Sequence, residues 1–92
     1  MQLYIHVGVA IALGILGTTY SDLGELTKAQ ELLESSVEIN KAINGLRHAG
    51  TAIAQTQLGR VMRLAGKLQD AKQILETALE TKENVYGMLH PG

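Results

Sequence analysis

Two arginines one helical turn apart are the residues of this chain whose type and spacing best suit a chemical task. Thr56, Arg60 and Arg63 occupy positions i, i+4 and i+7, so on a helix they form one polar stripe opposite Leu58 and Ala65. A guanidinium presents a planar fork of donors that matches a carboxylate. The stripe therefore indicates a binding site for an acidic peptide. The alternative is that both arginines are ordinary solvated residues on a helix surface.

Three histidines, His6, His48 and His90, are spaced 42 residues apart. A structural repeat with this period would separate them by about 10 Å, the spacing of packed helices. Zinc ligands instead share one ion at about 2 Å. We therefore expect each histidine to cap or order a turn between repeats, and we expect no metal site.

Residue patterns typical of catalysis are missing from the sequence. No serine lies in a Gly-x-Ser-x-Gly elbow, and Asp22 and Asp70 each stand alone where a helix is expected to end or begin. The segment from Gly14 to Gly17, followed by two threonines, lacks the lysine of a phosphate-binding loop and lies within a helical pattern. We expect neither an enzyme nor a cofactor.

The composition favours a small helical domain. Hydrophobic residues make up 46% of the 92 residues, with no Phe or Trp, so the core must be built mainly from aliphatic side chains that suit helix packing. The formal net charge of −1 disfavours nucleic acid as a partner. Cysteine is absent, so the redox compartment stays open, and the cytoplasm is the default expectation.

The apolar segment from Leu3 to Gly17 raises the question of a membrane. A spanning helix needs about 20 apolar residues, and this segment is shorter and contains His6. Met1 and Gln2 do not supply the basic start of a signal peptide. We expect a helix buried on several sides and no membrane partner.

The chain repeats itself with a period of 42 residues. When residues 6–50 are aligned with residues 48–92, 16 of the 45 pairs are identical. One unit therefore occurs twice, and the first residues of a third stand at the end. We predict a single domain over residues 1–92, with one repeat at about 8–45 and the other at about 50–87.

Within each unit the apolar residues recur at helical spacing, which predicts four main helices, at about 8–23, 27–43, 51–65 and 69–85. Gly24 and Gly66 stand where a left-handed C-terminal cap is wanted. Thr27 could serve as an N-cap, and Gln69 is a poorer one. Short turns make neighbouring helices antiparallel, and a hairpin cannot bury its apolar face alone, so the units must stack as a solenoid.

At this point the residues resemble a known family, the tetratricopeptide repeat. The matching residues are Leu16, Gly17, Tyr20, Gly24, Ala29, Leu33 and Ser36 in the first unit, and Leu58, Gly59, Met62, Gly66, Ala71, Leu75 and Ala78 in the second. Small residues at Gly17, Ala29, Gly59 and Ala71 would let the two helices of a hairpin approach closely. The resemblance implies an all-α superhelix of helix-turn-helix units that binds peptides. HEAT-like helical pairs share the period and are the main alternative.

The length of the unit indicates a subtype. An ordinary tetratricopeptide repeat has about 34 residues, whereas these units have 42. The extra length and the segment from Tyr86 to Pro91 look like the kinesin light chain type, whose linker often reads Gly-x-x-His-Pro. The first linker departs from that pattern because Ala49 follows His48.

The resemblance also implies which residues contact a ligand, since the first helix of each pair lines the concave groove in this family. The corresponding positions are Ile11, Gly14, Thr18, Ser21 and Asp22, followed by Ile53, Thr56, Gln57, Arg60 and Arg63. The asparagine and lysine pattern of members that bind chaperone tails is missing here. Glutamates of the second helices, such as Glu34 and Glu76, are expected on a solvated convex face.

Self-association is the alternative function. A solenoid normally needs about three repeats and polar ends, and the first helix is apolar nearly all round. We expect either a piece of a longer array or chains that associate through their ends, for example by exchanging a hairpin. The residues expected to carry this association are Ile5, Val9, Ile11, Leu13 and Ile15.

Overall fold

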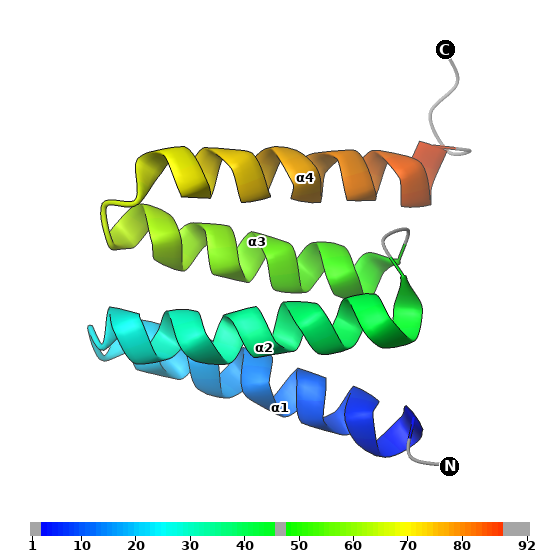
Figure 1. The fold of residues 1–92 in the computed structure, drawn as a ribbon, viewed down its shortest axis with the longest axis horizontal. Coiled ribbons are helices and arrows are strands. Elements are labelled where there is room, and N and C mark those ends of the chain that lie inside the picture. Colours follow the sequence, from blue (N-terminus) through cyan, green and yellow to red (C-terminus); the bar gives the residue numbers. More distant parts are fainter. Residues whose placement is uncertain (1–2, 46–47, 88–92) are drawn as a thin grey trace.

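Helices account for nearly all of the part of the chain that the structure describes. The computed structural model describes residues 3–45 and 48–87. It contains α1 (Leu3–Asp22), α2 (Leu26–Asn44), α3 (Ala49–Leu64) and α4 (Leu68–Tyr86), and no strand occurs within these residues (Figure 1). The predicted all-α fold with four helices is confirmed.

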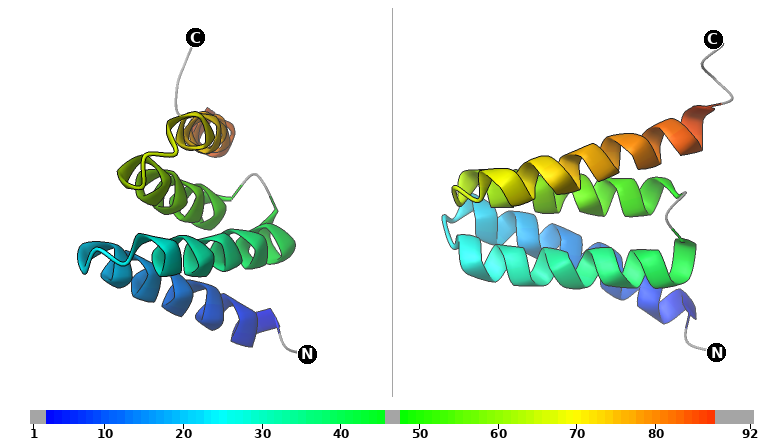
Figure 2. Two further views of the ribbon diagram at one scale, coloured as in Figure 1. Left: turned by 60° about the vertical axis from the view of Figure 1, so that its left-hand side comes forward. Right: turned by 45° about the horizontal axis from the view of Figure 1, so that its top comes forward.

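The helices form two hairpins that stack on each other. α1 packs against α2, α3 packs against α4, and α2 packs against α3 where the hairpins meet (Figures 1 and 2). α1 also approaches α3, whereas α2 and α4 make no close backbone contact within the described residues. The first helices therefore lie close together on one side of the stack, the inner side, and the second helices spread apart on the outer side.

Each hairpin turns at a glycine with a positive φ, 84° at Gly24 and 81° at Gly66. The Gly24 amide donates to the Ser21 carbonyl at 3.0 Å, and the Glu25 amide donates to the Tyr20 carbonyl at 2.9 Å. This pair of bonds is a Schellman motif, which satisfies carbonyls left free at the end of α1. The turn after α3 repeats it, so the predicted glycine caps are confirmed.

Two predicted N-caps are wrong. α2 begins at Leu26 with Glu25 in the cap position, and α4 begins at Leu68 with Lys67 there, so Thr27 and Gln69 lie inside their helices. Neither Glu25 nor Lys67 makes a capping hydrogen bond with its side chain. The Schellman turn leads directly into the next helix, which leaves no room for a separate capping residue. At the other end of the first hairpin, α1 begins at Leu3 rather than near residue 8.

The prediction that small residues let the two helices of a hairpin approach closely is confirmed at Gly17 and Gly59. A Cβ atom added to Gly17 would lie 2.7 Å from Cγ of Leu33, and one added to Gly59 would lie 2.5 Å from Cγ of Leu75. Real Cβ atoms do not approach carbon so closely, so each glycine allows a leucine of the partner helix to reach the backbone. Ala29 and Ala71, also predicted to be close, are 0% and 2% exposed.

The main core lies where the two hairpins meet. Its buried members are Ala29, Leu33 and Val37 of α2 and Ala54, Leu58 and Val61 of α3. Burial of such aliphatic side chains contributes about 25 cal/mol for each Å² of apolar surface removed from water. The stacking of one repeat on the next, as well as each hairpin, therefore holds the fold together.

Two buried polar contacts join the helices within the hairpins. The Ser36 hydroxyl of α2 donates to the Ala10 carbonyl of α1 at 3.0 Å. The Thr81 hydroxyl of α4 donates to Gln55 Oε1 of α3 at 3.1 Å. Gln55 is only 2% exposed, so this bond satisfies an amide oxygen that water cannot reach. These contacts fix how each second helix sits along its first.

The length and apolarity of α1 do not make it a membrane span. Within the described residues, no helix is both long enough and apolar enough to cross a bilayer.

Candidate functional site

A depression on the inner side brings together five of the ten residues predicted to line a groove. It has a volume of about 150 Å³ and lies between α1 and α3. The lining residues are Thr18, Ser21, Asp22, Gln57, Arg60, Val61 and Leu64. The first five of these belong to the predicted set, and they come from two helices that are separated by α2 in the sequence.

The polar groups of this inner depression differ in what they can still bind. The Thr18 hydroxyl donates to the carbonyls of Gly14 at 3.1 Å and Ile15 at 2.9 Å, so its oxygen remains an acceptor for a ligand. Gln57 lies over Gly14, where an added Cβ would be 3.1 Å from Gln57 Oε1. Gly14 thus makes room for an amide that can both donate and accept.

Arg60 supplies the positive charge of the depression and Asp22 the negative one. Arg60 is exposed, and within residues 3–45 and 48–87 its guanidinium makes no hydrogen bond or ion pair with the protein. Its donors are therefore available to a ligand carboxylate. Asp22 would repel the same carboxylate, so a bound acidic group is expected to face Arg60 and to avoid the end of α1.

Thr56 and Arg63 are two further predicted groove residues, and neither lines this depression. They occupy in α3 the positions that Gly14 and Ser21 occupy in α1, 42 residues earlier. Gly14 and Ser21 lie on the side of α1 that α3 covers. Thr56 and Arg63 therefore lie on the side of α3 that faces away from α1. The Thr56 hydroxyl donates to the Ala52 carbonyl at 2.8 Å, and Arg63 is exposed.

Two isoleucines, Ile11 and Ile53, extend the inner side beyond the polar depression. Both belong to the predicted groove, and they are 60% and 56% exposed. Ile11 was also predicted to carry self-association. Its counterpart Ile53 stays exposed although a neighbouring repeat is stacked beside it, so this position belongs to the groove side of the first helices.

The remaining residues predicted for self-association are placed differently from one another. Val9 and Ile15 are 42% and 62% exposed. Leu13 is half-buried and offers less surface than expected. The side chain of Ile5 lies outside the residues whose surroundings the structure describes.

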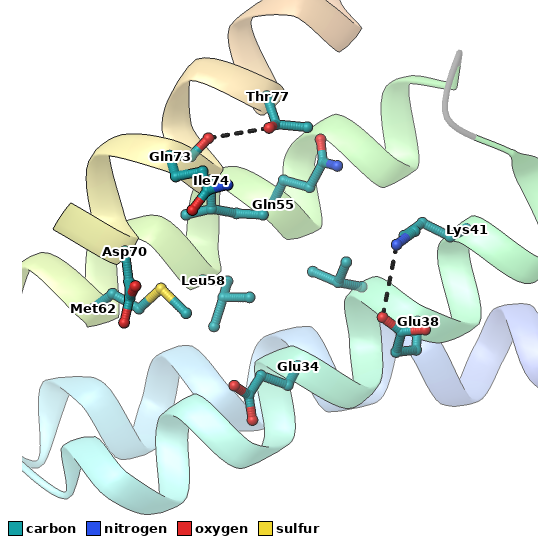
Figure 3. Close-up of a pocket in the computed structure, with 11 residues that line it drawn as sticks. Glu34, Glu38, Lys41, Gln55, Leu58, Met62, Asp70, Gln73, Ile74 and Thr77 are labelled. Carbon is teal, nitrogen blue, oxygen red and sulfur yellow. Dashed lines mark hydrogen bonds and ion pairs between the residues drawn. The ribbon is translucent and has the colours of Figure 1, made fainter. Parts of the chain in front are cut away.

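A larger groove on the outer side was not predicted. It has a volume of about 600 Å³ and runs between α2 and α4 with α3 as its floor (Figure 3). Glu34 and Glu38 of α2 line one wall and Asp70 of α4 the other, while Leu58 and Met62 lie at the floor. The sequence placed the glutamates on a solvated face, but the groove itself arises from the spreading of the second helices.

His48 has the structural role predicted for it. It is the N-cap residue of α3, and its Nδ1 accepts a hydrogen bond from the Gly50 amide at 2.9 Å. The surroundings of the His6 and His90 side chains lie outside the described residues. Among the residues that are described, no three potential ligands gather as a metal site would require.

The arrangement of stacked hairpins with adjacent first helices is the one expected of the family that the sequence resembles. A family model for the tetratricopeptide repeat matches residues 8–84. The chain belongs to the tetratricopeptide-repeat family. Tetratricopeptide repeats are scaffolds that mediate protein-protein interaction, and the HEAT-like alternative is set aside. Comparisons with curated proteins and with solved structures gave no match.

Proposed function

We propose that this tetratricopeptide-repeat chain binds an acidic peptide on its inner side, across α1 and α3. The observation that carries the proposal is one depression lined by five predicted groove residues, among them Arg60, whose guanidinium has no partner within the part of the chain that the structure describes. Arg60 would take a carboxylate in a two-point hydrogen bond. Thr18 and Gln57 would bind the peptide backbone.

The exposed isoleucines give the proposed peptide an apolar contact. Ile11 and Ile53 are exposed on the same side as the depression, so an extended ligand with an apolar residue beside its acidic one would cover them. Arg63 lies one turn beyond Arg60, outside the depression, so its positive charge would attract an acidic ligand from the rim without contacting the bound carboxylate. Such a rim charge mainly accelerates association and confers salt dependence.

Charge reversal tests the acidic-peptide proposal. The probe is a short fluorescein-labelled peptide of Glu, Leu and Gly that binds the parent chain, followed by fluorescence anisotropy. In the double variant Arg60→Glu, Arg63→Glu we expect affinity to fall by about tenfold or more, because losing a charge-assisted bond and gaining repulsion costs at least about 1.4 kcal/mol.

The matched control for that experiment is the variant Lys72→Glu, Lys82→Glu. It changes the net charge by the same amount, but both residues are exposed on α4, away from the inner side. We expect its affinity to stay within about twofold of the parent. Equal losses in the two variants would reduce the effect to net charge, and unchanged affinity in the arginine variant would refute the proposal.

The period of the repeat also supports the kinesin light chain type as the subtype. Both second helices span 19 residues. This length accounts for part of the excess over the ordinary repeat of about 34 residues. The departure at Ala49, which follows His48, stays as the feature that does not fit.

Self-association is the second candidate function, and the exposed apolar surface of α1 favours it. Val9, Ile15 and Leu16 are between 42% and 62% exposed. Isolated large apolar side chains are normal on a surface, but several along one helix indicate an interaction surface. Sedimentation equilibrium over a wide concentration range tests this candidate, and a monomer throughout would exclude it.

A further inference from the structure

The two ends of the stack expose residues whose counterparts inside the stack are buried. A shift of 42 residues relates Leu79 of α4 to Val37 of α2, and Leu16 of α1 to Leu58 of α3. Val37 and Leu58 belong to the core where α2 meets α3 and are 5% and 4% exposed. Leu79 and Leu16 are 59% and 46% exposed. Each end of the stack thus carries the equivalent of one side of the α2–α3 interface, and the two sides of that interface pack together inside the stack.

Further residues on the same helix faces show the same contrast. Leu68 is 62% exposed, whereas its counterpart Leu26 is partly buried against the core. Val9 is 42% exposed, whereas its counterpart Thr51 is 0% exposed. At helical spacing these residues form a tail face on α4, made of Leu68, Leu79 and the half-buried Leu75 between them. The head face on α1 is made of Val9, Leu16 and the exposed Ala12 between them.

A polar contact inside the stack predicts how charges would meet between two copies. Lys67 Nζ donates to Gln30 Oε1 at 2.8 Å, which ties the start of α4 to α2. Suppose that α1 of a second copy packs against α4 of the first in the way that α3 packs against α2 within one chain. Lys72 of the first copy would then occupy the position that Gln30 has inside the stack. Glu25 of the second copy would stand in the position of Lys67. The internal bond would become a pair of opposite charges.

The inner depression gives a second pair of opposite charges by the same relation. Ser21 and Leu64 line it together inside the stack. Their counterparts at a junction between copies are Arg63 of one chain and Asp22 of the next. Arg63, which faces away from α1 in its own chain, would then face the first helix of another.

One relation is unfavourable. Glu38 and Gln73 line opposite walls of the outer groove, and their counterparts at the junction are Glu80 and Glu31 of the next copy. These two glutamates would repel each other. They would do so across an open, solvated groove, where water and salt screen the repulsion. The two opposite-charge pairs and the apolar faces therefore decide the balance.

We propose that a second copy of this chain docks head to tail, with its head face on the tail face of the first. The inference rests on the second candidate function, self-association, and names the two surfaces that would carry it. Because the two surfaces differ, each docked pair keeps one free head face and one free tail face, so association continues into open stacks. Association through α1 alone would instead pair two identical faces and stop at a dimer.

Two single variants and their mixture test the head-to-tail arrangement by light scattering coupled to size exclusion. Leu79→Glu blocks the tail face and Leu16→Glu blocks the head face, and both residues are exposed in the single chain, so each variant should fold. The parent should increase in mass with concentration. Each variant alone should stay a monomer at concentrations where the parent associates, and an equimolar mixture should give twice the monomer mass. Ala42→Glu, on an exposed residue of α2 outside both faces, should associate as the parent does.

The outcomes separate this inference from self-association in general. If Leu79→Glu associates as strongly as the parent while Leu16→Glu does not, self-association through α1 stands and the head-to-tail arrangement fails. A mixture of folded variants that stays monomeric also overturns it. A parent chain that is monomeric at every concentration would refute both the head-to-tail arrangement and self-association in general. Circular dichroism of each variant establishes that a monomer is a folded one.

Discussion

At the scale of single residues, the buried pair of Gln55 and Thr81 makes the clearest prediction about stability. In Thr81→Val the side chain keeps its shape, but Gln55 Oε1 loses its donor at a site that is 2% exposed. We expect the free energy of unfolding to fall by about 1 to 3 kcal/mol, the usual cost of an unsatisfied buried polar atom. Urea unfolding followed by circular dichroism measures it.

Thr77→Val is the matched control for that measurement. The Thr77 hydroxyl donates only to the Gln73 carbonyl in its own helix, at 3.0 Å, on an exposed side. Its loss should change stability by about 0.5 kcal/mol or less. The Thr81 hydroxyl also donates to the Thr77 carbonyl in its own helix, at 2.9 Å. If both variants lose the same amount, the loss of such a bond within the helix, and not of the pair with Gln55, accounts for the effect.

At the same scale, the sequence predicts which residues reach the groove better than it predicts where each one faces. The spacing of Thr56, Arg60 and Arg63 indicates one stripe, and the stripe exists on α3. Only Arg60 of the three lines the inner depression, because α1 lies on one side of α3 and covers only part of the stripe. Which part is covered depends on the crossing of two helices that are distant in sequence.

At the scale of helices, the close approach within each hairpin leads to a prediction at Gly59. In Gly59→Ala the new Cβ would lie 2.5 Å from Cγ and Cδ2 of Leu75 and 2.9 Å from Cγ2 of Ile74. The helices must then move apart, so we expect a loss of about 1 to 3 kcal/mol, as for other overpacked cores. Thermal unfolding followed by circular dichroism checks this.

Gly8→Ala provides the control at a glycine that has no such role. Nothing lies within 4 Å of a Cβ added there, and Gly8 is exposed inside α1. Replacing a helical glycine by alanine usually stabilises by about 0.5 to 1 kcal/mol. An opposite effect of the two substitutions supports close packing at Gly59, and a Gly59→Ala variant as stable as the parent would contradict it.

Helix number and turns follow from the sequence because they depend on local residues. The glycines at 24 and 66 fix where the first helices end, and the apolar spacing fixes which faces are buried. The starts of α2 and α4 were misplaced by one residue because a Schellman turn feeds the next helix through its backbone. The outer groove was missed because it depends on the spread of α2 from α4, which no local pattern encodes.

At the scale of the whole molecule, the structure is a thin stack. Its extents of 40 × 37 × 16 Å show helices laid side by side, not a bundle closed on itself. Such a stack has two sides and two ends. The inner side carries the proposed peptide site, and the ends carry the head and tail faces, so binding a peptide and binding another copy use different surfaces.

Peptide binding and self-association would nevertheless both involve Arg63. Docking of a second copy would place Asp22 of that copy beside it, so the charge that a peptide could use at the rim would be partly neutralised. A chain in a stack should therefore depend more on Arg60 for an acidic ligand than a single chain does. This relation follows from the repeat register and needs no change of shape.

The most direct measurement of the central claim is a nuclear magnetic resonance titration of isotope-labelled chain with the acidic Glu, Leu and Gly peptide. We expect the largest shifts of amide signals at Thr18, Asp22, Gln57 and Arg60, which line the inner depression. Shifts concentrated at Glu34, Gln73 and Thr77 would place the ligand in the outer groove and contradict a peptide site across α1 and α3.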